Sequence, residues 1–191
     1  MRLFVALEIP PAVRDNLAAL IQELRGLAES LRDKRPRWVR AENLHVTLKF
    51  IGEASPAKAE SIRGALSAVR SDQATALTFR GLEFFPNEKH ARVFWAGIEA
   101  SPNLAPLAAD IDAALGTLGI AREKRAFVPH LTLARFEPPG MHEKIRSAIQ
   151  EKIAHEFGAL RTNEFHLIES KTRPSGAEYT TLHSFQFAAG V

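Results

Sequence analysis

Two short segments of the sequence carry the same set of chemically useful side chains. His45-Val46-Thr47-Leu48 and His130-Leu131-Thr132-Leu133 both follow the pattern His-x-Thr-Leu, and the composition gives such a pair a chance frequency of roughly 1 in 2,000. Each motif lies in a segment with the alternation of a strand, on which residues two apart project from one face about 6 to 7 Å from each other. The imidazole and the hydroxyl of each motif can therefore reach one small anionic group.

A pair of similar histidines suits a displacement at phosphorus in a cyclic phosphodiester. That reaction needs a base for the attacking oxygen and an acid for the departing oxygen, on opposite sides of the phosphorus. Histidine serves in either role near neutral pH, because its unperturbed pKa is about 6.5. We expect His45 and His130 to flank a single pocket and share these roles, with Thr47 and Thr132 donating hydrogen bonds to the non-bridging oxygens. The scheme requires no metal and no cofactor.

Two cations follow the motifs and are candidates for substrate binding. Lys49 lies four residues after His45, so a regular strand places it on the same face, where it either contacts substrate or ends at a solvated edge. Arg135 lies five residues after His130. This odd offset points Arg135 to the opposite face unless a bulge intervenes. Both cations would add positive charge beside the transition state.

A bound metal is the alternative explanation for two histidines. Neither motif has Cys, Asp or Glu at ligand spacing, so the metal set is incomplete. The chain has no cysteine, which excludes disulfides, thiolate zinc sites, iron–sulfur clusters and a cysteine nucleophile, and is typical of a reducing compartment. Four other histidines have no matching partner residues and are expected to be structural or exposed: His90, His142, His155 and His166. The role of His183, in the last strand, stays open.

The elements expected around the motifs occur twice along the chain. A buried strand is predicted over Arg2 to Ile9, followed by a helix from Val13 to Leu31. A second helix is predicted after Ser55-Pro56, a third begins after Ser101-Pro102 and ends at Gly119, and a fourth runs from about Met141 to His155. Residues 76–85 and 91–98 predict a hairpin. Each half thus has the order strand, helix, histidine-containing strand, helix, strand, with repeats at about 1–86 and 91–173 and a last strand at about 179–187.

This order predicts an α+β fold in one bilobal domain spanning residues 1–191. We expect two pseudo-symmetric lobes, each an antiparallel sheet with helices packed on its outer face, and a central cleft that both lobes line. The composition, 46% hydrophobic and 25% charged, is ordinary for a globular protein. No apolar run is long enough to span a membrane, and Glu8 interrupts the first one, so we expect a cytoplasmic protein.

The net charge of +3 does not identify a partner, but two groups of residues have an alternative to their ordinary structural role. The basic turn from Asp33 to Arg40, just before the first motif, forms either a solvated loop or a path for an RNA backbone. Several aromatic residues belong either to the core or to the edge of the cleft, where they would stack on bases; they are Phe4, Trp38, Phe94 and Trp95.

The motifs with their flanks resemble the 2H phosphoesterase superfamily. Within it, Glu42 to Glu53, Ala91 to Trp95 and Pro129 to Phe136 are similar to the RNA 2′,3′-cyclic phosphodiesterases, historically called 2′-5′ RNA ligases. Leu3 to Leu7 and Glu169 to Tyr179 also fit, so the resemblance covers nearly the full length.

This resemblance implies a reaction and a role for each motif residue. The reaction is hydrolysis of the 2′,3′-cyclic phosphate at an RNA or nucleotide end to a 2′-phosphate, with the 3′ oxygen leaving. The implied roles are His45 as the acid that protonates this oxygen, His130 as the base that activates water, and Thr47 and Thr132 as residues that hold the phosphate. Arginine at the position of Arg135 also belongs to the resemblance.

Other functions remain open at this point. The same site would serve a small cyclic-nucleotide phosphodiesterase or, in the reverse direction, a 2′-5′ RNA ligase. A non-catalytic protein on the same scaffold would bind RNA or nucleotide ends without turnover. We expect a monomer without a cofactor, whose partners are RNA ends or nucleotides that carry a 2′,3′-cyclic phosphate.

Overall fold

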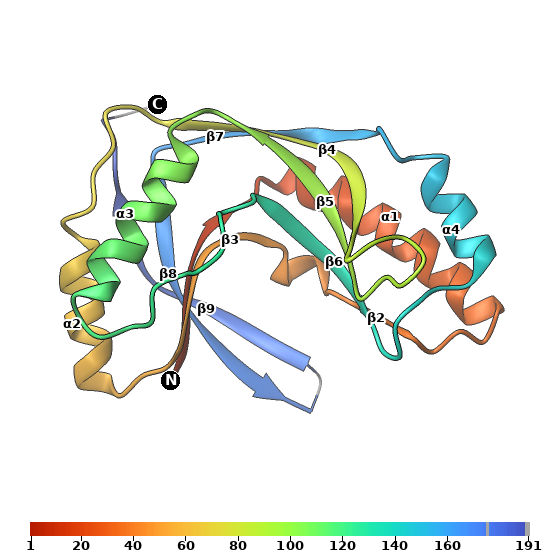
Figure 1. Cartoon of the computed structure of the whole chain (residues 1–191), viewed down its shortest axis with the longest axis horizontal. Helices are drawn as coiled ribbons and strands as arrows, with labels where there is room; N and C mark the ends of the chain where they lie inside the picture. The colour runs from red at the N-terminus through yellow and green to blue at the C-terminus, as the bar shows by residue number, and fades with distance from the viewer. Residues whose placement is uncertain (175, 190–191) are drawn as a thin grey trace.

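The computed structural model describes residues 1–174 and 176–189 and has an α+β fold built on two antiparallel sheets (Figure 1). The four-stranded sheet has the order β3 (His45–Glu53), β1 (Arg2–Glu8), β8 (Glu164–Arg173), β9 (Gly176–Gln186). The five-stranded sheet has the order β2 (Pro36–Trp38), β6 (His130–Phe136), β5 (Val93–Ala100), β4 (Thr75–Phe85), β7 (Glu156–Thr162). The two motif strands, β3 and β6, are thus in different sheets.

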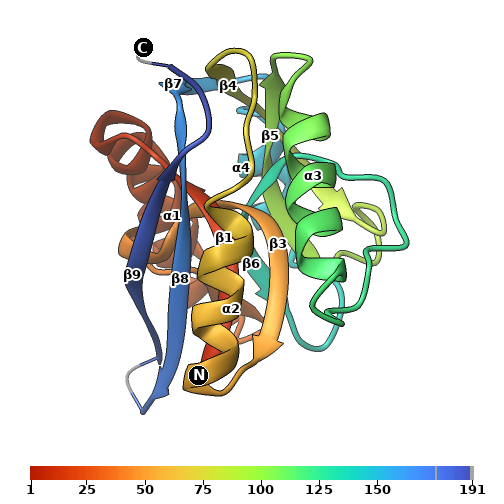
Figure 2. The same ribbon diagram turned by 90° about the vertical axis from the view of Figure 1, so that its left-hand side faces the viewer.

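Helices cover the outer side of each sheet, as predicted. Helices α2 (Pro56–Leu66) and α3 (Leu104–Gly116) pack together beside β3, while α1 (Pro11–Ser30) and α4 (Glu143–Gln150) pack together on the five-stranded sheet. Figure 1 shows the first pair on the left and the second on the right, with the strands between them. The view in Figure 2 places α2 in front of the four-stranded sheet. This arrangement confirms the expected α+β class.

The helix boundaries follow from local sequence signals. The hydroxyl of Ser55 accepts a hydrogen bond from the backbone N–H of Lys58 and caps α2, whose first residue is Pro56. Helix α3 ends in a turn at Gly119, where φ is +76° and a side chain would be strained, and the N–H of Ile120 donates back to the carbonyl of Leu115. Helix α4 is shorter than predicted because turns over residues 151–154 separate it from β7.

Two strands were not predicted from the sequence. The basic turn before the first motif contains the short edge strand β2, in which Pro36 occupies the first position, where a missing N–H is tolerated. Strand β7 pairs with β4 at the other edge of the five-stranded sheet, and Gly158 adopts a φ of +127° within it. In both strands the alternation of apolar and polar residues is too short to predict a strand from the sequence.

The two lobes do not correspond to the two halves of the sequence, which corrects the simplest form of the expected duplication. Strand β4 from the first half joins the five-stranded sheet, and β8 from the second half joins the four-stranded sheet. Helix α1 leaves β1 to pack on the five-stranded sheet, and α3 leaves β5 to pack beside β3. Each lobe therefore combines segments of both halves. The repeat boundaries themselves stay a prediction.

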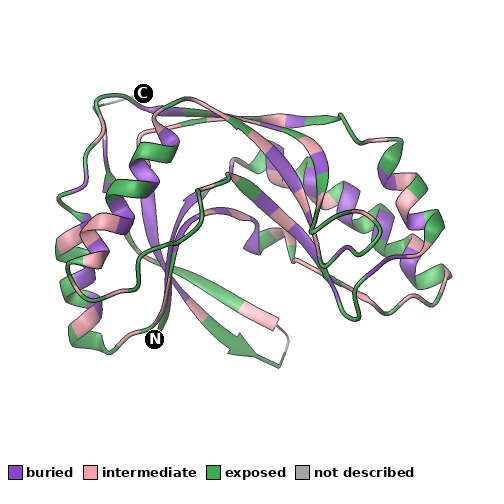
Figure 3. Ribbon diagram, viewed as in Figure 1, coloured by how far each residue is buried: buried purple, intermediate pink, exposed green. Residues whose placement is uncertain are grey.

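One continuous apolar core lies between the sheets and their helices, and it includes residues of both lobes. Figure 3 shows buried segments on the strands and on the inward sides of the helices. A second, small cluster of Phe4, Ala6 and Ile168 lies on the opposite face of the four-stranded sheet. Because β1 is buried on both faces, the side chains from Leu3 to Leu7 are all buried. Among the described residues, no helix has both the length and the apolarity needed to cross a membrane.

Candidate active site

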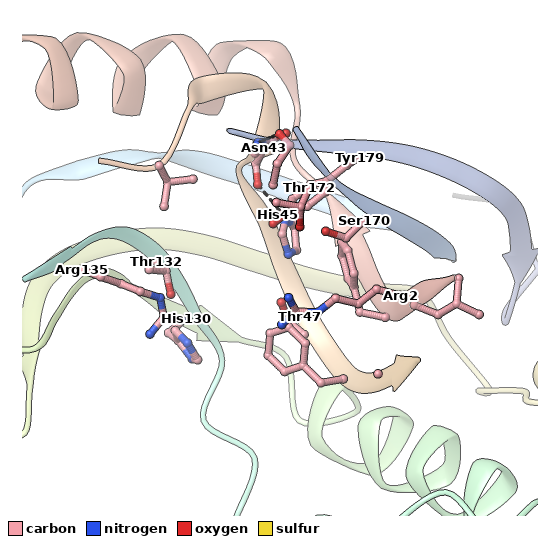
Figure 4. Close-up of a pocket in the computed structure, with 16 residues that line it drawn as sticks. Arg2, Asn43, His45, Thr47, His130, Thr132, Arg135, Ser170, Thr172 and Tyr179 are labelled. Atoms are coloured by element: carbon pink, nitrogen blue, oxygen red, sulfur yellow. Dashed lines mark hydrogen bonds between the residues drawn. The ribbon is translucent and has the colours of Figure 1, made fainter. Parts of the chain in front are cut away.

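Both His-x-Thr motifs line one cavity of about 400 Å³ between the two sheets. His45 and Thr47 enter it from β3, and His130 and Thr132 from β6. Figure 4 shows the two motifs on facing strands, with the cavity between them. The volume lies within the range of small-ligand sites. The expectation that the two histidines flank one pocket is thus confirmed.

A bulge follows the threonine of each motif. In the β1–β3 pair, Ala6 is opposite Thr47 and Val5 is opposite Lys49, so Leu48 is the extra residue. In the β5–β6 pair, Trp95 is opposite Thr132 and Phe94 is opposite Ala134, so Leu133 is the extra residue. Each bulge shifts the alternation by one residue, which places positions +2 and +5 from the histidine on the cavity side and position +4 on the core side.

The two bulges decide the positions of the candidate cations. Arg135, at +5, lines the cavity through the kind of bulge that its offset requires. Lys49, at +4, does not: its side chain is buried, and its Nζ pairs with Asp112 and donates to the carbonyl of Ala121, both at 2.6 Å. The expectation that Lys49 faces the same way as His45 is therefore wrong. Phe50, at +5, occupies the position equivalent to Arg135 and lines the cavity instead.

The ring of His45 is held in one orientation by the backbone. Its Nδ1 lies 2.7 Å from the carbonyl oxygen of Asn43, and since a carbonyl can only accept, Nδ1 carries a proton and Nε2 is the atom available for reaction. The rings of Phe4 and Tyr179 lie 4.7 and 5.2 Å from the imidazole between centroids. Burial lowers the pKa of His45, although the hydrogen bond to Asn43 opposes this shift.

His130 is fixed in the same way but is more exposed. Its Nδ1 lies 2.9 Å from the carbonyl oxygen of Val128. Val128 precedes His130 by two residues, just as Asn43 precedes His45. The same argument leaves Nε2 available for reaction. The ring of Trp95 meets it edge-on with a centroid distance of 5.5 Å. The structure thus presents two imidazoles of the same tautomer, one half-buried and one exposed.

Asn43 connects this site to the β8–β9 hairpin. Its side chain is buried and its Nδ2 donates to the carbonyl of Ala177 at 2.7 Å, while its own carbonyl orients His45. Ala177 belongs to β9, which also carries Tyr179. The position of the hairpin and the orientation of the catalytic candidate are therefore coupled through one residue.

The lining of the cavity is positively charged. The described residues that line it include Arg2 and Arg135 and no carboxylate. Burial raises the pKa of the Tyr179 phenol, and the charges of Arg2 and Arg135, which line the same cavity, act on it in the opposite direction. Such a cavity favours an anionic ligand. Sequence reasoning missed Arg2 and Tyr179 as site residues, along with the hydroxyls of Ser170 and Thr172.

The other sequence candidates lie outside the cavity, apart from Phe4. His166 is buried against the hydroxyl of Ser184, His142 caps α4, and His183 lies near Phe185. Among the aromatic candidates, Phe94 is buried and Trp38 packs against it. In the part of the chain that the structure describes, no three His, Asp or Glu side chains form a group suited to a metal ion.

The sequence matches the family model of the 2′-5′ RNA ligase superfamily over residues 13–173. Three relatives named RNA 2′,3′-cyclic phosphodiesterase cover nearly the whole chain. The one from Methanothermobacter thermautotrophicus is 30% identical and the alignment covers 97% of this chain and 98% of the relative. The relative from Methanocaldococcus jannaschii is 31% identical, with 95% and 98% covered, and that from Thermotoga maritima is 30% identical, with 100% and 98% covered.

Solved structures share the fold over the full length. A crystal structure of a Thermus thermophilus protein superposes with a TM-score of 0.78 at 27% identity, covering 98% of both chains. E. coli LigT complexed with 3′-AMP superposes with a TM-score of 0.75 at 25% identity, covering 97% of both chains. These proteins therefore share the overall fold of this chain.

Proposed function

Because the chain belongs to the 2′-5′ RNA ligase superfamily, we propose that it hydrolyses the 2′,3′-cyclic phosphate ends of RNA or nucleotides to 2′-phosphomonoesters without a metal ion. The observation that carries the proposal is the convergence of two backbone-anchored imidazoles and two threonines on one cationic cavity. Full-length relatives named for this activity support it.

The two imidazoles divide the proton transfers of the reaction. Nε2 of His130 accepts a proton from water as the water oxygen attacks phosphorus, and Nε2–H of His45 donates a proton to the 3′ oxygen as its bond to phosphorus breaks. Afterwards His130 is protonated and His45 is neutral, and exchange with solvent restores both. His130 suits the water side because its ring is exposed, whereas His45 is enclosed by Phe4 and Tyr179.

Substrate binding prepares His45 for its role as acid. In the free protein, burial lowers the pKa of His45 and favours the neutral form, which cannot donate from Nε2. A phosphodiester anion in the cavity favours the imidazolium by direct charge interaction. The acid therefore forms when substrate is bound, so the pKa of His45 is expected to be higher in the complex than in the free protein.

The remaining charged and polar groups act on the phosphate oxygens. The hydroxyls of Thr47 and Thr132 donate hydrogen bonds to the two non-bridging oxygens, and Arg135 adds a charge on the same side of the cavity as His130. Lys49 has no part in this scheme, since it is buried against Asp112. Removing one donor to a developing oxyanion costs about 3 kcal/mol, so the threonines are expected to matter less than the pair of histidines.

The test is to follow a short oligonucleotide ending in a 2′,3′-cyclic phosphate and to identify the position of the product phosphate. His45→Ala and His130→Ala should each lower kcat by about 10²- to 10⁴-fold, and His90→Ala, which alters an exposed histidine in a loop outside the cavity, should not. The pH–rate profile should be bell-shaped. EDTA should leave the rate unchanged.

Three outcomes would contradict the proposal. Retention of near wild-type rates by both histidine variants would remove the acid–base scheme. Loss of activity with chelator, and its rescue by zinc or manganese, would indicate a metal mechanism. Tight binding of the cyclic end without turnover would indicate a non-catalytic binding protein. Formation of 2′-5′ linkages at high concentrations of RNA ends would show that the same chemistry runs in reverse, because an enzyme accelerates both directions of one equilibrium.

A further inference from the structure

A row of four side chains crosses the cavity-facing side of the five-stranded sheet. The strand register places Arg37 of β2 opposite Arg135 of β6, Arg135 opposite Val93 of β5, and Val93 opposite Phe85 of β4. Directly opposite residues of antiparallel strands project from the same face. Since Arg135 lines the cavity, the whole row lies on the cavity side of the sheet, and Figure 1 shows its four strands side by side.

The row extends beyond the catalytic cavity, since Arg135 is the only one of its four residues that lines the cavity. Neighbouring strands are about 4.8 Å apart, so Phe85 lies about 10 Å from Arg135 on one side and Arg37 about 5 Å on the other. Phe85 is 54% exposed, although the adjacent Phe84 stacks on Phe94 on the core side of the sheet. An aromatic ring is therefore presented to solvent next to the site.

The charges along the row are complementary to a nucleic acid backbone. The register makes Arg37 and Arg135 direct cross-strand neighbours, so the row has two cations at one end. The ion pair of Arg37 with Glu137 is exposed on both sides, at 74% and 71%, so it is weak and exchanges readily for a phosphate. Glu83, opposite Trp95 in the neighbouring row, puts a carboxylate on the same face and disfavours a phosphate at that end. The backbone is therefore expected at the arginines and a base at Phe85.

We propose that this row binds the nucleotide that precedes the cyclic phosphate end, with its phosphate at Arg37, its base on Phe85, and Arg135 between them on the cyclic phosphate itself. The proposal rests on the proposed function, since it takes the cavity to hold the terminal nucleotide. Bases stack on exposed aromatic rings without regard to sequence, as in other proteins that bind single strands. The preferred substrate is then an oligonucleotide of any sequence and not a free cyclic nucleotide.

The experiment compares three substrates: a 2′,3′-cyclic mononucleotide, a trinucleotide with the same cyclic end, and that trinucleotide with an abasic penultimate residue. Wild-type kcat/KM should be highest for the intact trinucleotide. Phe85→Leu should lower kcat/KM on it by about fivefold or more, the least expected for one lost stacking contact, and leave the other two substrates unaffected. Phe85→Trp keeps a flat ring and should retain the preference.

Arg37→Ala tests the backbone contact. This substitution should lower kcat/KM equally for the trinucleotide and the abasic trinucleotide. It should also reduce the slope of log kcat/KM against log salt by about 0.7, the value for one phosphate contact on a single strand. Arg63→Ala is the matched control, because Arg63 forms an exposed ion pair with Glu60 on α2, away from the cavity.

The outcomes separate this inference from the proposed function. If the wild-type protein hydrolyses none of the three substrates, the proposed function is wrong and the inference goes with it. If it hydrolyses the mononucleotide and the trinucleotide equally well, or if Phe85→Leu affects the abasic substrate as much as the intact one, the inference is wrong while the phosphodiesterase activity stands.

Discussion

The buried ion pair of Lys49 with Asp112 predicts an asymmetry between two single substitutions. The side chains are 4% and 11% exposed and 2.6 Å apart. In Asp112→Leu, the ammonium of Lys49 keeps only the carbonyl of Ala121 among its partners in the described residues, and an uncompensated buried charge costs about 3–5 kcal/mol. In Lys49→Met, the carboxylate of Asp112 keeps Arg122 and the backbone N–H of Glu123, so we expect a loss of about 1–2 kcal/mol.

Thermal and urea unfolding measure this asymmetry. For a chain of this length, each kcal/mol shifts Tm by about 2–4 °C, so Asp112→Leu should lower Tm by about 6–20 °C and Lys49→Met by about 2–8 °C. The double variant places two apolar side chains together and should be more stable than Asp112→Leu alone. Glu60→Ala, which breaks an exposed pair, should cost less than about 1 kcal/mol.

Two results would refute this account of the pair. If Lys49→Met were as destabilising as Asp112→Leu, the result would show that Arg122 and Glu123 do not compensate the charge of the Asp112 carboxylate. A double variant with the summed loss of the two singles would show that no stranded charge is relieved. The activity of Lys49→Met carries a further check: since Lys49 lies outside the cavity, its kcat/KM should stay within about tenfold of wild type, or about 1.4 kcal/mol of transition-state stabilisation.

Three further predictions follow from other parts of the structure. An NMR titration should place the midpoint of His45 below about 6.5, the ordinary value, because burial lowers its pKa, and added inorganic phosphate should raise that midpoint; a midpoint above the ordinary value in the free protein would contradict the burial argument. The pKa of Asp33 is lowered mainly by its hydrogen bond with Arg35; burial raises the pKa of Asp112, but the hydrogen bonds from Lys49 and Arg122 outweigh burial and lower it. Their contribution to stability is therefore present above about pH 4 and lost as pH falls through the lower native pKa values, so these two carboxylates should make the urea midpoint decline in that acid range. In Gly97→Ala, the new Cβ would lie 2.5 Å from the carbonyl oxygen of Arg80, so urea unfolding should show a loss of about 1–3 kcal/mol, and an unchanged midpoint would mean that the backbone there yields freely.

Features encoded by neighbouring residues were predictable from the sequence. The apolar spacing of α1, the cap of α2 and the hairpin of β4 and β5 depend on residues close in the chain, and all three were confirmed. The two His-x-Thr motifs needed only their own spacing and their repetition. Those signals predict that His45 and His130 line one cavity, as they do in the structure, without any information on the partner strands.

Features set by partner strands were not predictable. The bulges at Leu48 and Leu133 form because the paired segments of β1 and β5 are each one residue shorter than the segments of β3 and β6 opposite them. The sequence around Leu48 and Leu133 contains no signal for such a bulge. The side of the sheet on which Lys49 lies therefore could not be read from its offset. Arg2 and Tyr179 reach the cavity from opposite ends of the chain. Tyr179 is the only tyrosine in the sequence, a signal too weak to place it without the fold.

The exchange of β4 and β8 between the lobes has a consequence for any attempt to divide this protein. A fragment cut near the middle of the chain would keep β1 and β3 without β8, and β4 without β5, so each fragment would expose the edges of unfinished sheets. Two complementary fragments, mixed together, should regain a native structure only as an interlocked pair. Half-length polypeptides of this kind would thus be obligate partners, bound to each other by the same strands that now make the single chain indivisible.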